Sequence, residues 1–274
     1  MEILTYRAFT TPDSNPHSGN LAGVVLDAET LSWEDMLSIA ADLGHSETAF
    51  LTEITSTSAR VRYFTPLDEI PFCGHATIAS GVALSHRGAG PIVAFSTNAG
   101  EVLVEVEPDS ATLTAVDTVI APLSDELLDL LLAALRLSRD DLDPALPPAF
   151  VRGANPHPIV FVGPGVLASL DHDHEAVLEL QIRNNWNGTV PVVHRGSPER
   201  FVSRNPFPRG GIREDSATGS AAAGLGAYLR AGGQLELPAV INIEQGAETG
   251  RPSLLAVEIP FEGRIRVTGT ASAA

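Results

Sequence analysis

Residues 214–229 read EDSATGSAAAGLGAYL, and this stretch decides the fold. Two acidic residues open it, Thr218-Gly219-Ser220 forms a turn, and small apolar residues follow. The pattern predicts a helix that is apolar on every side, and such a helix has to be enclosed by protein. We expect Ser220 near its N-cap and Gly232-Gly233 to end it in a left-handed cap. The free N–H groups of its first turn then offer an anion site.

A second stretch of the same design lies earlier in the chain. Residues 68–84 read DEIPFCGHATIASGVAL, again with acids, a glycine turn and a helix without a charged face. Placing Cys73-Gly74-His75 on Thr218-Gly219-Ser220 also sets residues 62–66 on residues 202–206, with a longer loop in the second copy. Two such halves predict a duplicated fold. Chance similarity between two helices rich in Ala and Gly is the alternative.

The composition is that of a compact protein with many turns. The 274 residues include 44% hydrophobic residues, 24 Gly and 20 Pro, enough for two domains of ordinary size. A net charge of -17 argues against nucleic acid or an anionic membrane as a partner. The single cysteine excludes an internal disulfide. With an N-terminus unlike a signal peptide, these features lead us to expect a cytoplasmic protein.

Strand and turn signals fill most of the remaining sequence. Helices are expected at residues 32–43, with Ser32 as N-cap and Gly44 as C-cap, and at 124–137 and 174–183. Strands are expected at residues 2–9, 24–26, 46–52, 60–64, 92–95, 101–107, 111–119, 158–162, 189–194, 200–204, 240–243, 254–259 and 264–267. The expected class is α+β, with a mostly antiparallel sheet around one apolar helix in each half. The halves divide into residues 1–119 and 120–262, and the last strand, 263–270, returns to the first half.

Glu47 is the carboxylate of most interest. It lies in an uncharged strand segment, on the same face as Ala49. An acid in such surroundings is partly desolvated, which raises its pKa and suits it to proton transfer near neutral pH. The alternative is an acid at a strand edge that points into water.

Three polar residues flank the two glycine turns. His75 begins the first helix and is a candidate to bind a substrate carboxylate, or else a structural residue at a helix start. Asp215 precedes the second helix, where it either orients a polar group across the cleft or complements the helix dipole. Ser220 at an N-cap is structural more often than catalytic.

Cys73 raises a different possibility. A thiol at a helix N-terminus has a lowered pKa and can act as a base or nucleophile. A racemase with two bases would need a partner, and the equivalent residue in the second half, Thr218, is a poor base. The alternative is a small apolar core residue.

The remaining motifs are weak. Asp171-His-Asp-His174 contains metal-ligand types but lies at a charged helix start. A Gly-x-Gly-x-x-Gly motif with a following acid is absent, which disfavours a dinucleotide oxidoreductase.

Taken in order, five segments resemble a known family: Gly19-Asn20, residues 46–50 (SETAF), 71–77 (PFCGHAT), 214–220 (EDSATGS) and Gln245-Gly with residues 250–253 (GRPS). Together they resemble the PhzF-like isomerases of phenazine biosynthesis, which have the diaminopimelate-epimerase-like fold. The resemblance covers essentially the whole chain. It implies two pseudo-symmetric domains, each a β-barrel-like sheet around a central helix, with the active site between them. It also implies a homodimer, no cofactor and no metal.

The resemblance also implies roles for residues. Glu47 matches the acid/base that moves a proton between two carbons, and His75 and Asp215 match the polar residues beside it. Asn20, Gly74, Gly219 and Ser220 match the substrate-binding positions. We therefore hypothesise an isomerase of a small carboxylated metabolite, similar to trans-2,3-dihydro-3-hydroxyanthranilate isomerase.

Two departures from the family pattern keep the alternatives open. Cys73 stands where the phenazine enzyme has a small residue and related racemases have a catalytic cysteine. Leu21 follows Gly19-Asn20 where the family commonly has proline, a change at the rim of the pocket. A racemase or epimerase that depends on Cys73, or a protein that binds a small acid without chemistry, remains the alternative function.

Overall fold

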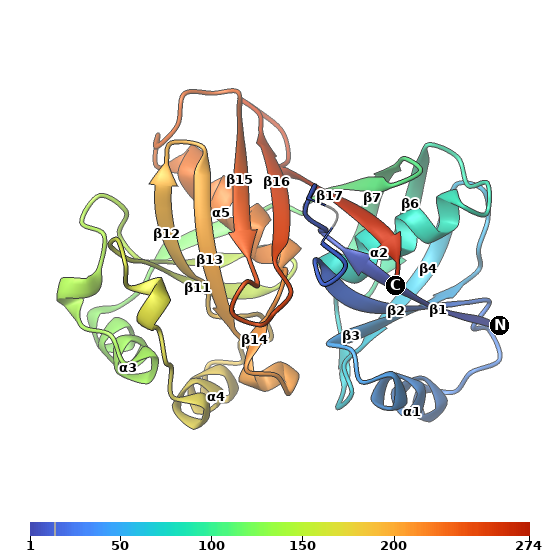
Figure 1. Cartoon of the computed structure of the whole chain (residues 1–274), viewed down its shortest axis with the longest axis horizontal. Coiled ribbons are helices and arrows are strands. Elements are labelled where there is room, and N and C mark those ends of the chain that lie inside the picture. The colour runs from blue at the N-terminus through green and yellow to red at the C-terminus, as the bar shows by residue number, and fades with distance from the viewer. Residues whose placement is uncertain (14) are drawn as a thin grey trace.

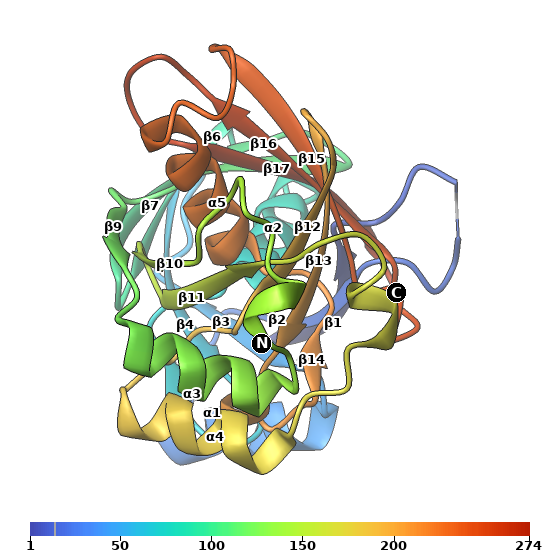
Figure 2. The same ribbon diagram turned by 90° about the vertical axis from the view of Figure 1, so that its left-hand side faces the viewer.

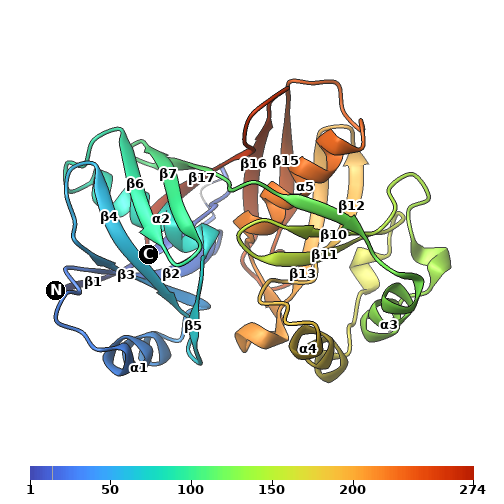
Figure 3. The ribbon, with the colours of Figure 1, turned by 180° about the vertical axis from the view of Figure 1, so that it is seen from behind.

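The computed structural model describes residues 1–13 and 15–274, which form two lobes side by side (Figure 1). Each lobe is a curved sheet around one helix, α2 (Gly74–Ser85) in the first lobe and α5 (Gly219–Ala231) in the second (Figure 3). Every residue of α2 from Gly74 to Leu84 is buried, and α5 is buried over most of its length. The predicted enclosure of both apolar helices is confirmed.

The first lobe is a closed barrel of eight strands. Around the barrel the order is β1-β2-β3-β4-β6-β7-β8-β17 and back to β1; the β2–β3 and β4–β6 pairs are parallel and the rest antiparallel. The strands are β1 (Glu2–Ala8), β2 (Asn20–Leu26), β3 (Glu47–Thr52), β4 (Ser58–Phe64), β6 (Ile92–Thr97), β7 (Gly100–Val106), β8 (Ser110–Thr114) and β17 (Arg266–Ala273).

The second lobe repeats this pairing scheme. Its order is β9-β10-β11-β12-β13-β15-β16-β17, again with two parallel pairs, β11–β12 and β13–β15. Its strands are β9 (Val119–Pro122), β10 (Ala149–Arg152), β11 (Pro156–Phe161), β12 (Val192–Ser197), β13 (Arg200–Pro206), β15 (Ala239–Gln245) and β16 (Ser253–Ile259). The short strands β5 (Glu69–Ile70) and β14 (Glu214–Asp215) occupy matching places beside β4 and β13.

Strand β17 joins the lobes. Its first residues pair with β16 and β8, and its last residues pair with β1. In Figure 1 it extends from the second lobe into the first, where the C-terminus lies. The last strand therefore completes the first barrel, while the boundary at residues 119 and 120 stays a prediction.

Three further helices lie outside the barrels: α1 (Trp33–Leu43) on the first lobe, and α3 (Asp125–Leu135) and α4 (His174–Arg183) next to each other on the second (Figure 2). Helix α1 has the predicted ends, because Ser32 forms a capping box with Asp35 and Gly44 adopts a φ of 64°. Short 3-10 turns occur at Arg139–Asp141, Leu167–Ser169 and Pro208–Gly210.

One apolar cluster runs through both lobes and includes residues of both central helices, such as Ile78 and Leu225. Side chains at the junction of the lobes, Phe72 and Ala217 among them, belong to the same cluster. Burial of this continuous core fixes the starts of α2 and α5 relative to each other. Among the described residues no helix is both long and apolar enough to cross a membrane.

Three expectations about local structure were wrong. Residues 111–119 form two strands rather than one, and β10 follows a Pro-rich segment that gave no strand signal. The N-cap of α5 is Thr218, and Ser220 is the second residue of the helix. The expected left-handed cap at Gly232-Gly233 is confirmed, because Gly233 has a φ of 61° and the N–H of Gln234 donates to the backbone oxygen of Leu229 at 2.9 Å.

The alignment of the two halves was also out of register upstream of the helices. Phe50 pairs with Arg62 in the first lobe, and Val192 pairs with Arg204 in the second. Arg204, rather than Val202, is therefore the counterpart of Arg62. Each arginine forms an ion pair with an acid of the following short strand, Glu69 or Glu214.

Closure of the first barrel depends on Gly269 in β17. A Cβ atom at this position would overlap the ring of Phe9, which is completely buried. We predict that Gly269→Ala lowers the free energy of unfolding by about 1–3 kcal/mol, as overpacking does in other cores. Urea denaturation measures this change, with Gly196→Ala as the matched control because its Cβ would meet only an ordinary contact at 3.6 Å. Equal stability of the two variants would contradict the prediction.

Candidate active site

The first turns of α2 and α5 touch each other between the lobes. A Cβ atom on Gly74 would lie 3.0 Å from the Cα of Gly219, and one on Gly219 would lie 3.3 Å from the Cα of Gly74. Because neither residue has a side chain, the two backbones come into direct contact. The positive ends of both helix dipoles therefore face the same region.

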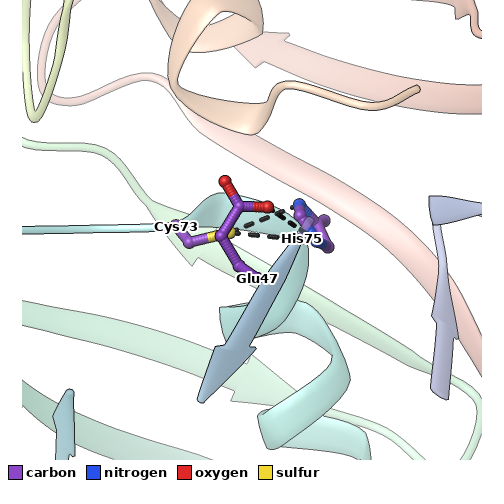
Figure 4. Close-up of side chains that lie close together, drawn as sticks. All are labelled: Glu47, Cys73 and His75. Atoms are coloured by element: carbon purple, nitrogen blue, oxygen red, sulfur yellow. Dashed lines mark hydrogen bonds and ion pairs between the residues drawn. The ribbon is translucent and has the colours of Figure 1, made fainter. Parts of the chain in front are cut away.

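Glu47 lies beside this contact, at the first residue of β3. Its side chain is 4% exposed, and its Oε2 atom lies 3.4 Å from Nε2 of His75. Figure 4 shows Glu47, Cys73 and His75 pointing toward one another. The Oε2 atom is buried and accepts no hydrogen bond from the described residues. The structure thus places Glu47 in a desolvated position and not at a solvated strand edge.

Two buried carboxyl groups share the site, and their surroundings differ. Burial, and to a smaller extent the charge of Asp215, raise the pKa of Glu47 to about 8. Burial also raises the pKa of Asp215, to about 6, but hydrogen bonds from Thr218, Asn20 and backbone N–H groups limit that increase. Near pH 7, Glu47 therefore holds a proton that Asp215 has lost.

Asn20 connects Asp215 to His75. Its Nδ2 atom donates to Oδ1 of Asp215 at 2.6 Å and lies 3.2 Å from Nδ1 of His75. An amide nitrogen has two hydrogens, so it can donate to both groups. Nδ1 of His75 is then an acceptor and Nε2 carries the proton, facing Glu47 and the hydroxyl of Ser46 at 3.3 Å. Burial lowers the pKa of His75 to about 3, so this imidazole is neutral.

Two residues that the sequence reasoning did not assign to the site hold Asp215 in place. The hydroxyl of Thr218 donates to Oδ2 of Asp215 at 2.6 Å. The side-chain amide of Gln245 donates to the backbone oxygen of Asp215 at 2.7 Å and lies 3.1 Å from Oγ1 of Thr218. Gln245 belongs to one of the family segments, which was the available signal.

A second polar cluster surrounds Ser220 in the first turn of α5. The hydroxyl of Ser220 is 2.8 Å from Nε2 of His157, and Nδ1 of His157 is 3.1 Å from the backbone oxygen of Thr189. Nδ2 of Asn155 donates to the backbone oxygen of Phe72 at 3.2 Å and lies 3.4 Å from the hydroxyl of Ser220. Ser220 is therefore held by tertiary contacts and not by an N-cap bond. Sequence reasoning missed Asn155, His157 and Thr189.

Because both lobes have the same strand pairing, residues of this second cluster can be matched to residues of the first cluster. Val25 pairs with Phe50 in the first lobe as Val160 pairs with Val192 in the second. The residue five positions before Val25 is Asn20, and the residue five before Val160 is Asn155.

The strands that pair with these two, β3 and β12, can be matched in the same way. Three positions before Phe50 and Val192 lie Glu47 and Thr189. The second lobe therefore has a hydroxyl at the place where the first has its buried acid.

Both clusters line one narrow cavity at the junction of the lobes, with about 330 Å³ of free space including its open mouth. Its apolar lining comes from Ile70, Phe72, Phe207 and Ala217. All the expected site residues except Asn20 line it directly, and Asn20 lies behind His75 and Asp215.

Cys73 is buried, and its Sγ atom lies 3.3 Å from Nδ1 of His75. Burial raises the pKa of this thiol, with a further increase from the charge of Glu47. The expected lowering by the helix N-terminus was wrong, because desolvation outweighs the dipole. Glu47, Cys73 and His75 have ligand atoms within 4.8 Å of one another, and these donor types fit a zinc ion chemically.

Residues 171–174, which contain metal-ligand types, make structural contacts. Asp173 caps helix α4, and Asp171 forms ion pairs with Arg136 and Arg213. His172 is buried 3.9 Å from Glu214.

Comparison with known proteins identifies the class. Residues 6–274 match the family model described as phenazine biosynthesis-like protein, PhzC-PhzF. The chain therefore belongs to this family. Its relatives are named as isomerases, and the chain is an isomerase of this family.

Individual relatives match over most of their length. The uncharacterized isomerase YddE of Escherichia coli is 33% identical over 279 residues, covering 96% of this chain and 93% of the relative. The trans-2,3-dihydro-3-hydroxyanthranilate isomerase of Pseudomonas chlororaphis is 33% identical over 249 residues, covering 88% and 85%.

Solved structures agree with this assignment. A PhzF-family protein of Bacillus anthracis is 25% identical and superposes with a TM-score of 0.84, covering 100% of this chain and 98% of that one. A probable proline racemase of Agrobacterium radiobacter shares the fold, with a TM-score of 0.66 at 14% identity over 99% of this chain and 90% of that one. The diaminopimelate-epimerase-like architecture expected from sequence is confirmed.

The raised pKa of Glu47 has a consequence for stability. Between its ordinary value of 4.5 and about 8, the folded protein holds a proton that the unfolded chain releases. Rising pH therefore removes stability in this window, by at most about 1.4 kcal/mol per pH unit. We predict that Glu47→Gln is more stable than the unmodified chain at pH 8, and that this advantage shrinks toward pH 4.5.

Denaturant titrations at several pH values measure the difference. Glu53→Gln, at the exposed residue that follows β3, is the matched control. A flat difference for Glu47→Gln would show that the carboxyl group has an ordinary pKa.

Proposed function

We propose that this isomerase moves a proton between two carbons of a small carboxylated metabolite, with Glu47 as the proton carrier. The observation that supports this most is a buried carboxyl group with a pKa of about 8 beside two facing helix N-termini. A proton carrier works best when its pKa is close to the working pH. The site combines such a group with donors for an anion.

The substrate carboxylate binds at the two helix starts in this proposal. Backbone N–H groups at Gly74-His75 and Gly219-Ser220 have no partner within the first turn of a helix and are aimed at the junction of the lobes. When a proton leaves the carbon next to a carboxylate, negative charge builds up on the carboxylate oxygens. Fixed N–H donors stabilise that charge without having to reorient.

Glu47 alone can both remove and return the proton, so the reaction needs no second acid or base. Glu47 removes a hydrogen from one carbon as a base and returns it to another carbon on the same face as an acid, or performs the two steps in the reverse order. Either order restores its starting form and needs no net electron transfer. Thr189 holds the matching position in the second lobe, so the opposite side has a hydroxyl and no second acid.

The other polar residues control the state of Glu47. Asp215 carries the negative charge that raises its pKa, and Asn20 and Thr218 keep Asp215 ionised. The neutral Nε2–H of His75 faces the Glu47 carboxyl and the cavity. We assign His75 and Asp215 to substrate contact and to the tuning of Glu47.

The substrate class follows from the family and the cavity. Relatives of this chain are named trans-2,3-dihydro-3-hydroxyanthranilate isomerases, so this compound is the first substrate to test. We propose a cyclic or unsaturated carboxylic acid, since the apolar lining accepts a flat carbon framework beside a carboxylate. We also propose a cytoplasmic homodimer, which light scattering of the purified protein tests.

Hydrogen exchange tests the role of Glu47. In heavy water the Glu47 carboxyl carries deuterium between turnovers, so the product gains deuterium at the carbon that receives the proton. We predict that Glu47→Gln abolishes this incorporation, measured by NMR on a substrate that is turned over. Incorporation that persists in Glu47→Gln would move the base to another residue.

Cys73→Ala separates this mechanism from the Cys73-dependent racemase. A thiol base would make the variant inactive, whereas the Glu47 mechanism retains at least about a tenth of the exchange rate, because the loss is limited to packing. Tight binding of a carboxylic acid without exchange in the unmodified chain would favour a non-catalytic binding protein.

A further inference from the structure

The cluster around Ser220 is built with a defined direction of hydrogen bonding. His157 is 1% exposed, and its Nε2 atom lies 2.8 Å from the Ser220 hydroxyl. Its Nδ1 atom lies 3.1 Å from the backbone oxygen and 3.2 Å from the hydroxyl oxygen of Thr189. The carbonyl oxygen only accepts hydrogen bonds, whereas the hydroxyl can accept or donate, so only a ring hydrogen on Nδ1 satisfies both contacts. We therefore place the ring hydrogen on Nδ1, which makes Nε2 an acceptor.

This tautomer fixes the Ser220 hydroxyl. At 2.8 Å from an acceptor nitrogen, the hydroxyl donates its only hydrogen to Nε2 of His157. Asn155 uses one amide hydrogen on the backbone oxygen of Phe72 and directs the other to the Ser220 oxygen, 3.4 Å away. One lone pair of Ser220 then remains free at the cavity that Ser220 lines.

Each hydrogen-bonding group that reaches the substrate from this side thus has a fixed character. The helix N–H groups are donors and suit a carboxylate, whereas the Ser220 oxygen is an acceptor. A second carboxylate or a keto oxygen at Ser220 would face a lone pair and be repelled. An N–H or O–H group would be bound.

We propose that His157 is a positioning residue that makes Ser220 a hydrogen-bond acceptor, and that this pair determines the preference of the site for an amino or hydroxyl donor close to the substrate carboxylate. This proposal rests on the proposed function only in that Ser220 faces the substrate. The two buried histidines then have opposite tautomers, with the ring hydrogen on Nδ1 of His157 and on Nε2 of His75.

Nitrogen NMR of the ¹⁵N-histidine-labelled chain tests the tautomers directly, with signals assigned by His157→Gln and His75→Gln. The expected result at neutral pH is a protonated Nδ1 and an unprotonated Nε2 for His157. A ring hydrogen on Nε2 of His157 would make Ser220 a donor and would overturn the proposal.

Ligand selectivity tests the consequence. The probes are 2- and 3-aminobenzoate against 2- and 3-methylbenzoate, which match in shape but differ in the N–H donor, with binding measured by calorimetry. We expect the better aminobenzoate to bind at least tenfold more tightly than its methyl partner, about 1.4 kcal/mol. In Ser220→Ala and in His157→Phe this ratio falls to about one.

Each other outcome counts against the proposal. A merely structural His157 would weaken both ligands equally and leave their ratio unchanged. Equal binding of the pairs by the unmodified chain, binding of none of them at millimolar concentration, or a ratio that survives Ser220→Ala would overturn it. If His157→Phe does not fold, Ser220→Ala and the NMR result decide. The tautomer and the binding ratio are both measured without turnover, so failure of the proton-transfer mechanism is distinguishable from failure of this selectivity.

Discussion

The backbone contact between Gly74 and Gly219 is the constraint on which the rest of the structure depends. Two helices can meet end to end at this distance only if neither first residue has a side chain. Their apolar surfaces require enclosure, and a closed barrel and a curved open sheet with the same pairing scheme supply it. The contact then brings the first-turn backbone N–H groups of both buried helices to one place between the lobes.

The local electrostatics gives the two carboxyl groups at this place different protonation states. Asp215 is surrounded by donors and is kept ionised, whereas Glu47 has an oxygen without a donor and holds its proton. When two acids lie close together in a buried site, one stays protonated, because ionising both would place two negative charges close together with little solvent around them. The duplicated lobes are thus chemically unequal, with an acid in one and Thr189 in the other.

Much of this was predictable from local sequence. Uniform apolarity identified both central helices, and an acid within an uncharged strand identified Glu47. The missed residues are Asn155, His157 and Thr189. Their meeting at Ser220 depends on the register between β11 and β12 and on the packing of α5 against β11, which no local pattern encodes. Two errors have one cause: the N-cap role of Ser220 and the lowered pKa of Cys73 are helix-end rules, and tertiary burial and contacts overrode both.

Infrared difference spectroscopy of the carboxyl stretch tests the central claim, that Glu47 is buried and still protonated at neutral pH. The spectrum of the unmodified chain minus that of Glu47→Gln, recorded from about pH 3 to 10, isolates this one group. The account predicts a protonated-carboxyl band that persists at neutral pH and disappears with a midpoint near pH 8. Loss of the band with a midpoint at the ordinary value of 4.5 would contradict it.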